Sequence, residues 1–211
     1  EDFIPVFTPT LTEVNYLDLH DDYNATPFIN LYKNALFFID QQIGQVFEQI
    51  SHDLDNTIVI ITGDHGQEFN DSNQGFWGHN SNYSPYQTKV PLIIHWPNKQ
   101  QHNKYSFTSH VDLVPTLMTE LFQVPNAVSE YSSGHSLFSE QTKDSIILGR
   151  QGNYAVQDRQ YIYQLDRLGN YSVYDLNYQR QDDKALNIKT VSKALKEMSR
   201  FYQPSTEAKS G

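Results

Sequence analysis

A β-branched run that leads into Gly-Asp-His-Gly is the feature that most constrains this chain of 211 residues. The run, Thr57–Thr62, reads TIVIIT and lacks the alternation of a strand with one wet face. It predicts a strand buried on both faces, as in a parallel sheet covered by helices. Val90–Trp96, with the sequence VPLIIHW, predicts a second buried strand, which Pro97 ends.

Helical patterns occur on both sides of these strands. Residues 27–52 carry apolar side chains at spacings of three and four, with a proline in the first turn and Thr26 as a candidate N-cap. Ser109–Val124 predicts another helix, which Pro115 restricts to a start near Asp112. The alternation of helices and strands predicts an α/β fold with a helix-covered, largely parallel sheet.

The pattern changes after about residue 140. Short Tyr-rich runs and a turn at 166–170 predict a small antiparallel sheet, with strands at 145–150, 154–159, 161–165 and 171–176. A C-terminal helix follows at 188–202, where Ile188, Val191, Leu195, Met198 and Tyr202 share one face. The expected organisation is an acidic irregular lead-in (1–26), an α/β part (27–140), the small sheet with its helix (141–203) and a disordered tail (204–211).

Composition excludes several classes of protein. The formal net charge of -10 argues against nucleic acid as a partner, because phosphate backbones require a surplus of Lys and Arg. The absence of cysteine excludes disulfides and thiolate metal sites, so any metal must be held by oxygen and nitrogen ligands. No apolar run is long enough to span a membrane, and the chain starts without Met or a signal peptide. A piece of a longer protein is therefore expected.

Asp64 and His65 follow the first strand directly, where ligands collect in open α/β sheets. Asp offers oxygen and His a neutral ring nitrogen to a divalent cation. The flanking Gly63 and Gly66 allow a sharp turn and a close approach by a ligand. His79 lies fifteen residues beyond Asp64. The intervening loop, which is rich in glycine, could fold this histidine back over the pair.

An alternative reading of the same stretch is equally open at this point. Gly-Asp is a common turn sequence. Gln67, Glu68, Asn70 and Asp71 could then be solvated loop residues. Lys89, just before the second strand, could reach an anionic substrate. Trp77 could shape the mouth of a pocket or simply anchor the loop.

The motifs TIVIITGDHGQEF, WGHN, TKVPLIIHWP and TSHVDLVPTLMTELF, in this order, resemble the C-terminal part of the sulfatase/alkaline-phosphatase superfamily. The helix NLYKNALFFIDQQIGQVFEQI resembles the helix that precedes the Asp-His strand there. The segment HVDLVPTLMTELFQVPNAVSEYSSGHSLF is most similar to the YejM/PbgA-like inner-membrane proteins of Gram-negative bacteria. The resemblance extends over most of the chain.

The resemblance implies a function for three residues. Asp64 and His65 would bind a catalytic divalent metal ion, which could be Zn, Mn, Ca or Mg, and His79 would contact the phosphate or sulfate group. The superfamily also needs an acidic metal ligand and a Thr, Ser or formylglycine nucleophile. Neither is found in this sequence, and both are expected upstream of Glu1, so that the piece alone would be inactive and could lack the metal.

Two functions are consistent with these features. In the first, the full-length protein is a membrane-anchored periplasmic hydrolase or transferase that acts on phosphate, phosphoethanolamine or sulfate esters carried by lipids. In the second, the same fold is a non-enzymatic periplasmic sensor that binds lipid or lipopolysaccharide. Both predict an inner-membrane anchor upstream and an anionic lipid or lipopolysaccharide as partner. Some YejM/PbgA-like proteins lack the Asp-His pair, whereas this sequence keeps it.

Overall fold

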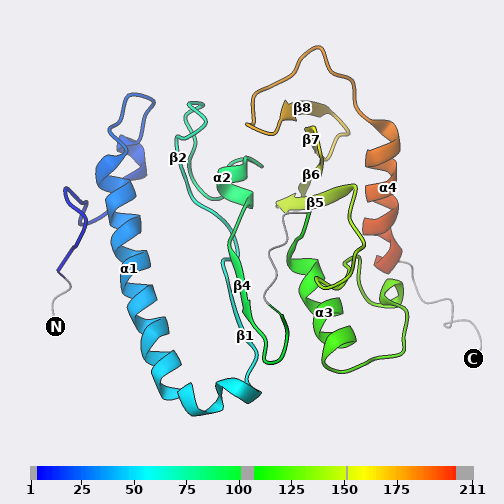
Figure 1. Ribbon diagram of the computed structural model, residues 1–211. Helices are drawn as coiled ribbons and strands as arrows, with labels where there is room; N and C mark the ends of the chain where they lie inside the picture. The colour runs from blue at the N-terminus through cyan, green and yellow to red at the C-terminus, as the bar shows by residue number, and fades with distance from the viewer. Residues whose placement is uncertain (1–3, 101–106, 151, 203–211) are drawn as a thin grey trace, which may run out of the picture. The chain divides into compact units, whose positions relative to one another are not determined.

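The computed structural model of the protein describes residues 4–100, 107–150 and 152–202, and the chain forms two compact units that divide between His102 and Asn103 (Figure 1). The fold class is confirmed as α/β, with a small antiparallel sheet and a C-terminal helix. The predicted tail at 204–211 lies outside the described residues. No helix in the described ranges is both long and apolar enough to cross a bilayer.

The first unit contains the long helix α1 (Thr26–Gln49) and the irregular lead-in, which carries the short 3-10 helix η1 (Tyr16–Asp18). Two buried amides of α1 bind the lead-in. The side-chain oxygen of Asn34 accepts from Val6 N and Phe7 N at 2.9 and 2.8 Å, and Asn30 donates to the carbonyl of Pro9 at 2.9 Å. The acidic lead-in is therefore a covering segment of the helix.

The start of α1 differs from the prediction. Thr26 is the first helical residue, and Ala25 is the N-cap without a side-chain hydrogen bond. The Asn24 side chain accepts from Thr26 N at 3.0 Å instead. The helix ends at Gln49, and a 3-10 helix, η2 (Ser51–Asn56), leads to the first strand. Much of the apolar stripe of α1 stays exposed, with Ile39 at 50%.

The two apolar strands pair directly, but in the opposite sense to the prediction. Strand β1 (Val59–Thr62) and strand β4 (Leu92–His95) are antiparallel, and Val59 lies opposite His95. They form a two-stranded sheet in the described residues, and Ile93 is 61% exposed. The predicted burial on both faces is also not found: β1 is half-buried apart from the exposed Thr62, and Leu92, Ile93 and His95 of β4 are exposed. A continuous apolar run carries no information about strand direction, which depends on how the connecting loop returns.

The loop between these strands has its own structure. Strands β2 (Glu68–Phe69) and β3 (Trp77–Gly78) form a small antiparallel pair, and the helix α2 (Pro85–Thr88) follows. The loop is anchored to α1 through ring contacts. Phe28 meets Phe69 at 5.1 Å and Trp77 at 6.3 Å between ring centroids.

The second unit contains the four-stranded sheet, in the order β5-β6-β7-β8 with every pair antiparallel. Its strands are β5 (Ser145–Arg150), β6 (Asn153–Asp158), β7 (Tyr161–Leu165) and β8 (Tyr171–Asp175). Helix α4 (Ile188–Ser199), which continues into the 3-10 helix η5 (Arg200–Tyr202), packs on the sheet. The core consists of Val156, Tyr163, Leu165, Val173, Val191 and Ala194.

The buried face of α4 is only partly the predicted one. Val191 is buried as expected, but Ile188 is 71% exposed and Ala194 takes a place in the core. Val191 and Ala194 are three residues apart and therefore lie on the same side of the helix, which faces the sheet. The buried positions are thus set by their place on the helix and not by the size of their apolar side chains. The turn between β7 and β8 is as predicted, with Gly169 at φ +85°.

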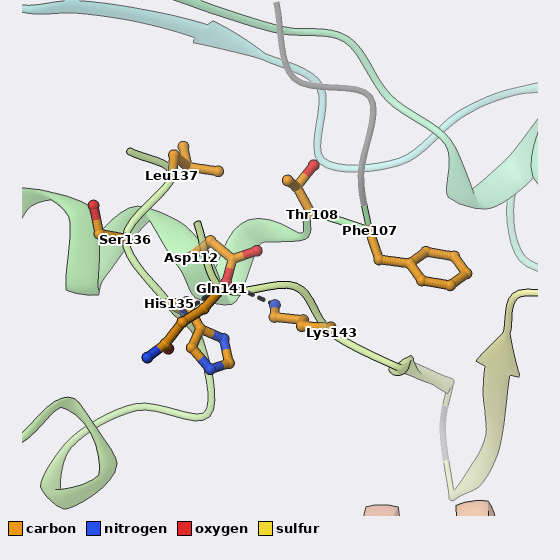
Figure 2. A pocket seen from close by; sticks show the side chains of 8 residues that line it. All are labelled: Phe107, Thr108, Asp112, His135, Ser136, Leu137, Gln141 and Lys143. Atoms are coloured by element: carbon orange, nitrogen blue, oxygen red, sulfur yellow. Dashed lines mark hydrogen bonds and ion pairs between the residues drawn. The ribbon is translucent and has the colours of Figure 1, made fainter. Parts of the chain in front are cut away.

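The helix α3 (Leu113–Glu120) follows the 3-10 helix η3 (His110–Asp112), which confirms a start near Asp112. Asp112 is the centre of a small pocket (Figure 2). Its carboxylate accepts from Lys143 Nζ at 2.7 Å and from the backbone N–H groups of Ser109 and His135 at 2.8 Å each. These bonds connect the start of α3 to the segment that leads into the sheet. A further 3-10 helix, η4 (Val128–Glu130), lies between them.

Candidate functional site

The predicted Asp-His pair lies in the turn that follows β1. The side chain of Asp64 is 89% exposed and that of His65 is 43% exposed. Asp64 Oδ1 accepts from the backbone N–H of His65 at 3.0 Å and lies 3.6 Å from His65 Nε2. The two side chains therefore approach one another at the strand end, as the two flanking glycines were expected to allow.

His79 folds back over this pair, as the loop was expected to allow. Its ring stacks on the ring of His65, with the centroids 4.0 Å apart and the planes 13° from parallel. Its Nδ1 lies 3.1 Å from the side-chain oxygen of Gln67. Asp64, His65 and His79, which the sequence separates by up to fifteen residues, are thus brought together in one place.

The hydrogen bonds of both rings determine which nitrogen stays available. His65 Nδ1 lies 2.9 Å from the carbonyl oxygen of Gly66, and His79 Nδ1 faces the amide oxygen of Gln67. These oxygens only accept, so in each neutral ring Nδ1 carries the hydrogen and Nε2 keeps its lone pair. Histidine ligands of metals are commonly oriented in this way, with the other ring N–H given to a carbonyl oxygen.

The spacing of the pair fits a single divalent cation. Two ligands at the usual zinc distances, in a tetrahedral arrangement, lie about 3.3 Å apart, close to the 3.6 Å between Asp64 Oδ1 and His65 Nε2. Within 4–100, 107–150 and 152–202, however, no three His, Asp or Glu side chains form a group able to hold a metal ion. The pair therefore fits as two ligands of a larger set.

Glu68 is the residue that sequence reasoning missed. It was read as a possible solvated loop residue, but it is fully buried, at 0% exposure. Its carboxylate accepts from Asn82, Ser84 and Gln87 at 2.8, 2.9 and 2.7 Å, and from the hydroxyl of Ser72. A signal was available, because residues 63–88 contain many Asn, Gln and Ser but no Lys or Arg. The solvated reading is also wrong for Asn70, which is 9% exposed.

Gly66 allows the Asp-His turn to approach α2 closely. Its backbone N–H donates to the carbonyl of Gln87 at 2.9 Å. A Cβ at this position would lie 2.1 Å from the carbonyl oxygen of Tyr86. Glycine is therefore required by backbone contact. Lys89 caps the C-terminal end of this same helix and is exposed, so the helix that touches the turn also carries this candidate substrate ligand.

Trp77 packs toward α1. Its ring meets Tyr23 edge-on at 5.7 Å and stacks on Phe28 at 6.3 Å between centroids. These contacts correspond to the loop-anchoring alternative for Trp77. The ring holds the loop that carries His79 against the helix.

These features place the chain among α/β proteins that carry a cluster of polar side chains beyond the end of a strand. The sequence profile described as Sulfatase matches residues 5–122, which is more than half of the chain. The chain therefore belongs to the sulfatase family.

Relatives fall into two groups. The chain is 30% identical over 135 residues to the inner membrane protein YejM of Salmonella typhimurium, covering 63% of this chain and 22% of that protein. It is 26% identical over 163 residues to an ulvan-active sulfatase of Formosa agariphila, covering 70% of this chain and 23% of that protein. The chain thus spans less than a quarter of the length of either relative.

A solved structure shows the same fold. The phosphonate monoester hydrolase of Agrobacterium radiobacter superposes with a TM-score of 0.65 at 18% identity, covering 85% of this chain and 43% of that one. At this identity the likeness concerns the fold. It extends well beyond the residues matched by the family profile, into the second unit.

Proposed function

We propose that this chain is part of a membrane-anchored, periplasmic, metal-dependent hydrolase or transferase that acts on phosphate, phosphoethanolamine or sulfate esters. The observation that carries the proposal is the arrangement at the end of β1. Asp64 Oδ1 and His65 Nε2 lie at the spacing of two ligands of one ion, and His79 is stacked beside them. Membership of the sulfatase family supports the same chemistry.

Each residue has a distinct function in this proposal. Asp64 and His65 hold the divalent ion, and the carbonyl of Gly66 keeps the His65 ring in the orientation that presents Nε2. A bound divalent ion neutralises charge on the transferred group and lowers the pKa of the attacking hydroxyl. His79, oriented by Gln67, donates from Nε2 to an ester oxygen or to the leaving group when it is protonated.

The remaining catalytic groups belong to a longer protein in this proposal. An acidic ligand and a hydroxyl nucleophile complete the site, which is consistent with a chain that spans 22% of its YejM relative. That relative is named an inner membrane protein, which supports an inner-membrane location for the present protein. An anionic lipid or lipopolysaccharide is the partner that we propose at this location. The net charge of -10 speaks against nucleic acid.

One observation favours a second candidate, a non-enzymatic lipid-binding sensor on the same fold. The described residues hold only a two-ligand site, and the carboxylate of Asp64 is 89% exposed. A sensor needs no metal and no nucleophile. It predicts binding to anionic lipid or lipopolysaccharide without any turnover.

Metal binding tests the proposal directly. Calorimetric titration of the chain with Zn²⁺ or Mn²⁺ should show weak binding, and Asp64→Ala should weaken it at least about tenfold. The chain offers a matched control in Asp53, whose carboxylate lies 3.1 Å from the exposed His52. Asp53→Ala removes the carboxylate of another adjacent pair and should leave the affinity unchanged.

Turnover separates the two candidates. The full-length protein should hydrolyse a phosphodiester or sulfate ester, and Asp64→Ala should abolish that activity. Equal activity in the wild type and in Asp64→Ala would refute the proposed site. Binding of lipopolysaccharide that is unaffected by Asp64→Ala, with no turnover in the wild type, would establish the sensor instead.

A further inference from the structure

Glu68 is a buried charge that the proposed reaction does not use. It is 0% exposed, and four side chains donate hydrogen bonds to its carboxylate. All four donors are neutral hydroxyl or amide groups. Burying a carboxylate is costly unless hydrogen bonds compensate for the lost water. The four partners of Glu68 compensate for the water that its carboxyl group loses on burial.

Three of the four donors come from the segment that follows His79. Asn82, Ser84 and Gln87 all bind Oε2 of Glu68, at 2.7 to 2.9 Å. Gln87 extends the network, because its side-chain oxygen accepts from the backbone N–H of Ser81 at 3.1 Å. The carboxylate thus connects the residue three positions after His65 to residues that begin three positions after His79.

This connection closes a ring of chain around the two histidines. One arm runs from His65 to Glu68, and the other runs from His79 to Asn82. The two arms meet at the Glu68 carboxylate. They are therefore joined there as well as by the stacked histidine rings, whose centroids lie 4.0 Å apart. Gly66, whose N–H binds Gln87 O at 2.9 Å, adds a third tie between the same two segments.

We infer that Glu68 is a positioning residue, which holds His79 against His65 without touching substrate or metal itself. The inference rests on the proposed function for its catalytic meaning. The structural part of it, the stacking of the two rings, can be measured whether or not the chain binds a metal ion.

Two substitutions at Glu68 remove different numbers of its hydrogen bonds. In Glu68→Gln the amide oxygen can keep two of the three donors on Oε2, and the new NH₂ can donate to the Ser72 hydroxyl, so one buried donor is left unpaired. In Glu68→Leu all four donors lose their acceptor. The matched control is Asp71→Asn, which makes the same chemical change on the same loop at an exposed residue.

The readout is the NOE between the rings of His65 and His79, recorded together with the NOE between Trp77 and Phe28. The second contact belongs to the same loop but faces α1. In Glu68→Gln we expect the histidine NOE to fall by at least half while the Trp77 contact persists. We expect the histidine NOE to vanish in Glu68→Leu and both NOEs to stay unchanged in Asp71→Asn.

Two results would overturn the inference. An unchanged histidine NOE in Glu68→Gln would show that the carboxylate does not position His79. Parallel loss of both NOEs in Glu68→Gln would show that Glu68 stabilises the whole loop without a specific effect on the histidines. Turnover by the full-length protein is measured separately, so equal activity in the wild type and in Asp64→Ala refutes the proposed function and leaves the test of Glu68 intact.

Discussion

The ion pair between Asp112 and Lys143 provides a sharp test of the energetics of the second unit. The two side chains are 4% and 10% exposed, and their charged atoms lie 2.7 Å apart. Lys143 also donates to Ser109 Oγ at 3.0 Å (Figure 2 shows the pocket). Lys143→Met keeps the length of the side chain and its apolar stem but removes the charge. The carboxylate of Asp112 is then buried without a cation.

The expected loss of unfolding free energy depends on the hydrogen bonds that the Asp112 carboxylate keeps in Lys143→Met. Removing one partner of a buried ion pair costs about 3–5 kcal/mol, because the other charge stays buried and unpaired. Asp112 still accepts from the backbone N–H groups of Ser109 and His135 at 2.8 Å each. These two bonds place the expected loss of unfolding free energy at the lower end, about 3 kcal/mol. The exposed Lys189 offers a matched control, and Lys189→Met should cost less than about 0.5 kcal/mol.

The measurement must report on the correct unit. Both tryptophans of the chain, Trp77 and Trp96, lie in the first unit, so tryptophan fluorescence does not follow the region around Lys143. Amide hydrogen exchange read by mass spectrometry resolves peptides of α3 and of the four-stranded sheet. Their free energy of opening should fall in Lys143→Met. A loss below about 1 kcal/mol would refute the reasoning, because a buried unpaired carboxylate cannot cost so little.

Two further predictions concern single groups. Gly66→Ala should push the Asp-His turn away from Tyr86 and lower the free energy of opening by about 1–3 kcal/mol, measured by the same hydrogen exchange on peptides of 63–89. The control is Gly149→Ala, whose Cβ meets nothing within 4 Å. Equal effects of the two substitutions would contradict the contact at Gly66. Burial and the Asp158 carboxylate raise the pKa of Tyr163 from its ordinary 10.0 to about 12. The folded state therefore holds this proton more tightly, and the unfolding free energy should fall by about 2 kcal/mol as pH rises from 10 to 12. Tyr163→Phe should remove that part of the pH dependence in urea unfolding, and a wild-type slope retained by the variant would refute it.

The sequence predicted well wherever local patterns determine structure. The strands β5 and β7 and the start of α4 coincide with the predicted ranges, because alternation, turn residues and helix periodicity act over a few neighbouring residues. The sequence also indicated that Asp64, His65 and His79 could converge, since the glycines around them permit the sharp turns that this requires.

The predictions were wrong where contacts between residues distant in the sequence determine the structure. The direction of β4 relative to β1 depends on the path of 63–91, and apolar content does not record it. A solvated position was one of the readings open for Glu68. Its burial depends on donors up to nineteen residues away, and the sequence signal for it, a loop rich in Asn, Gln and Ser without Lys or Arg, does not single out Glu68. The face of α4 that packs on the sheet includes Ala194, which the predicted face did not. Which face packs is decided by contacts with the sheet, and these are not visible in the local pattern.

The segment from His65 to Gln87 pairs several of its polar groups internally. The Glu68 carboxylate and the Gly66 N–H both bind partners inside the segment, and three ring contacts join it to α1: Phe69 with Phe28 and Tyr32, and Trp77 with Phe28. Such a segment is a module that could be exchanged between homologues. A chimaera would need to supply the aromatic residues that contact Phe69 and Trp77, and both imidazoles would travel with a graft that begins at His65.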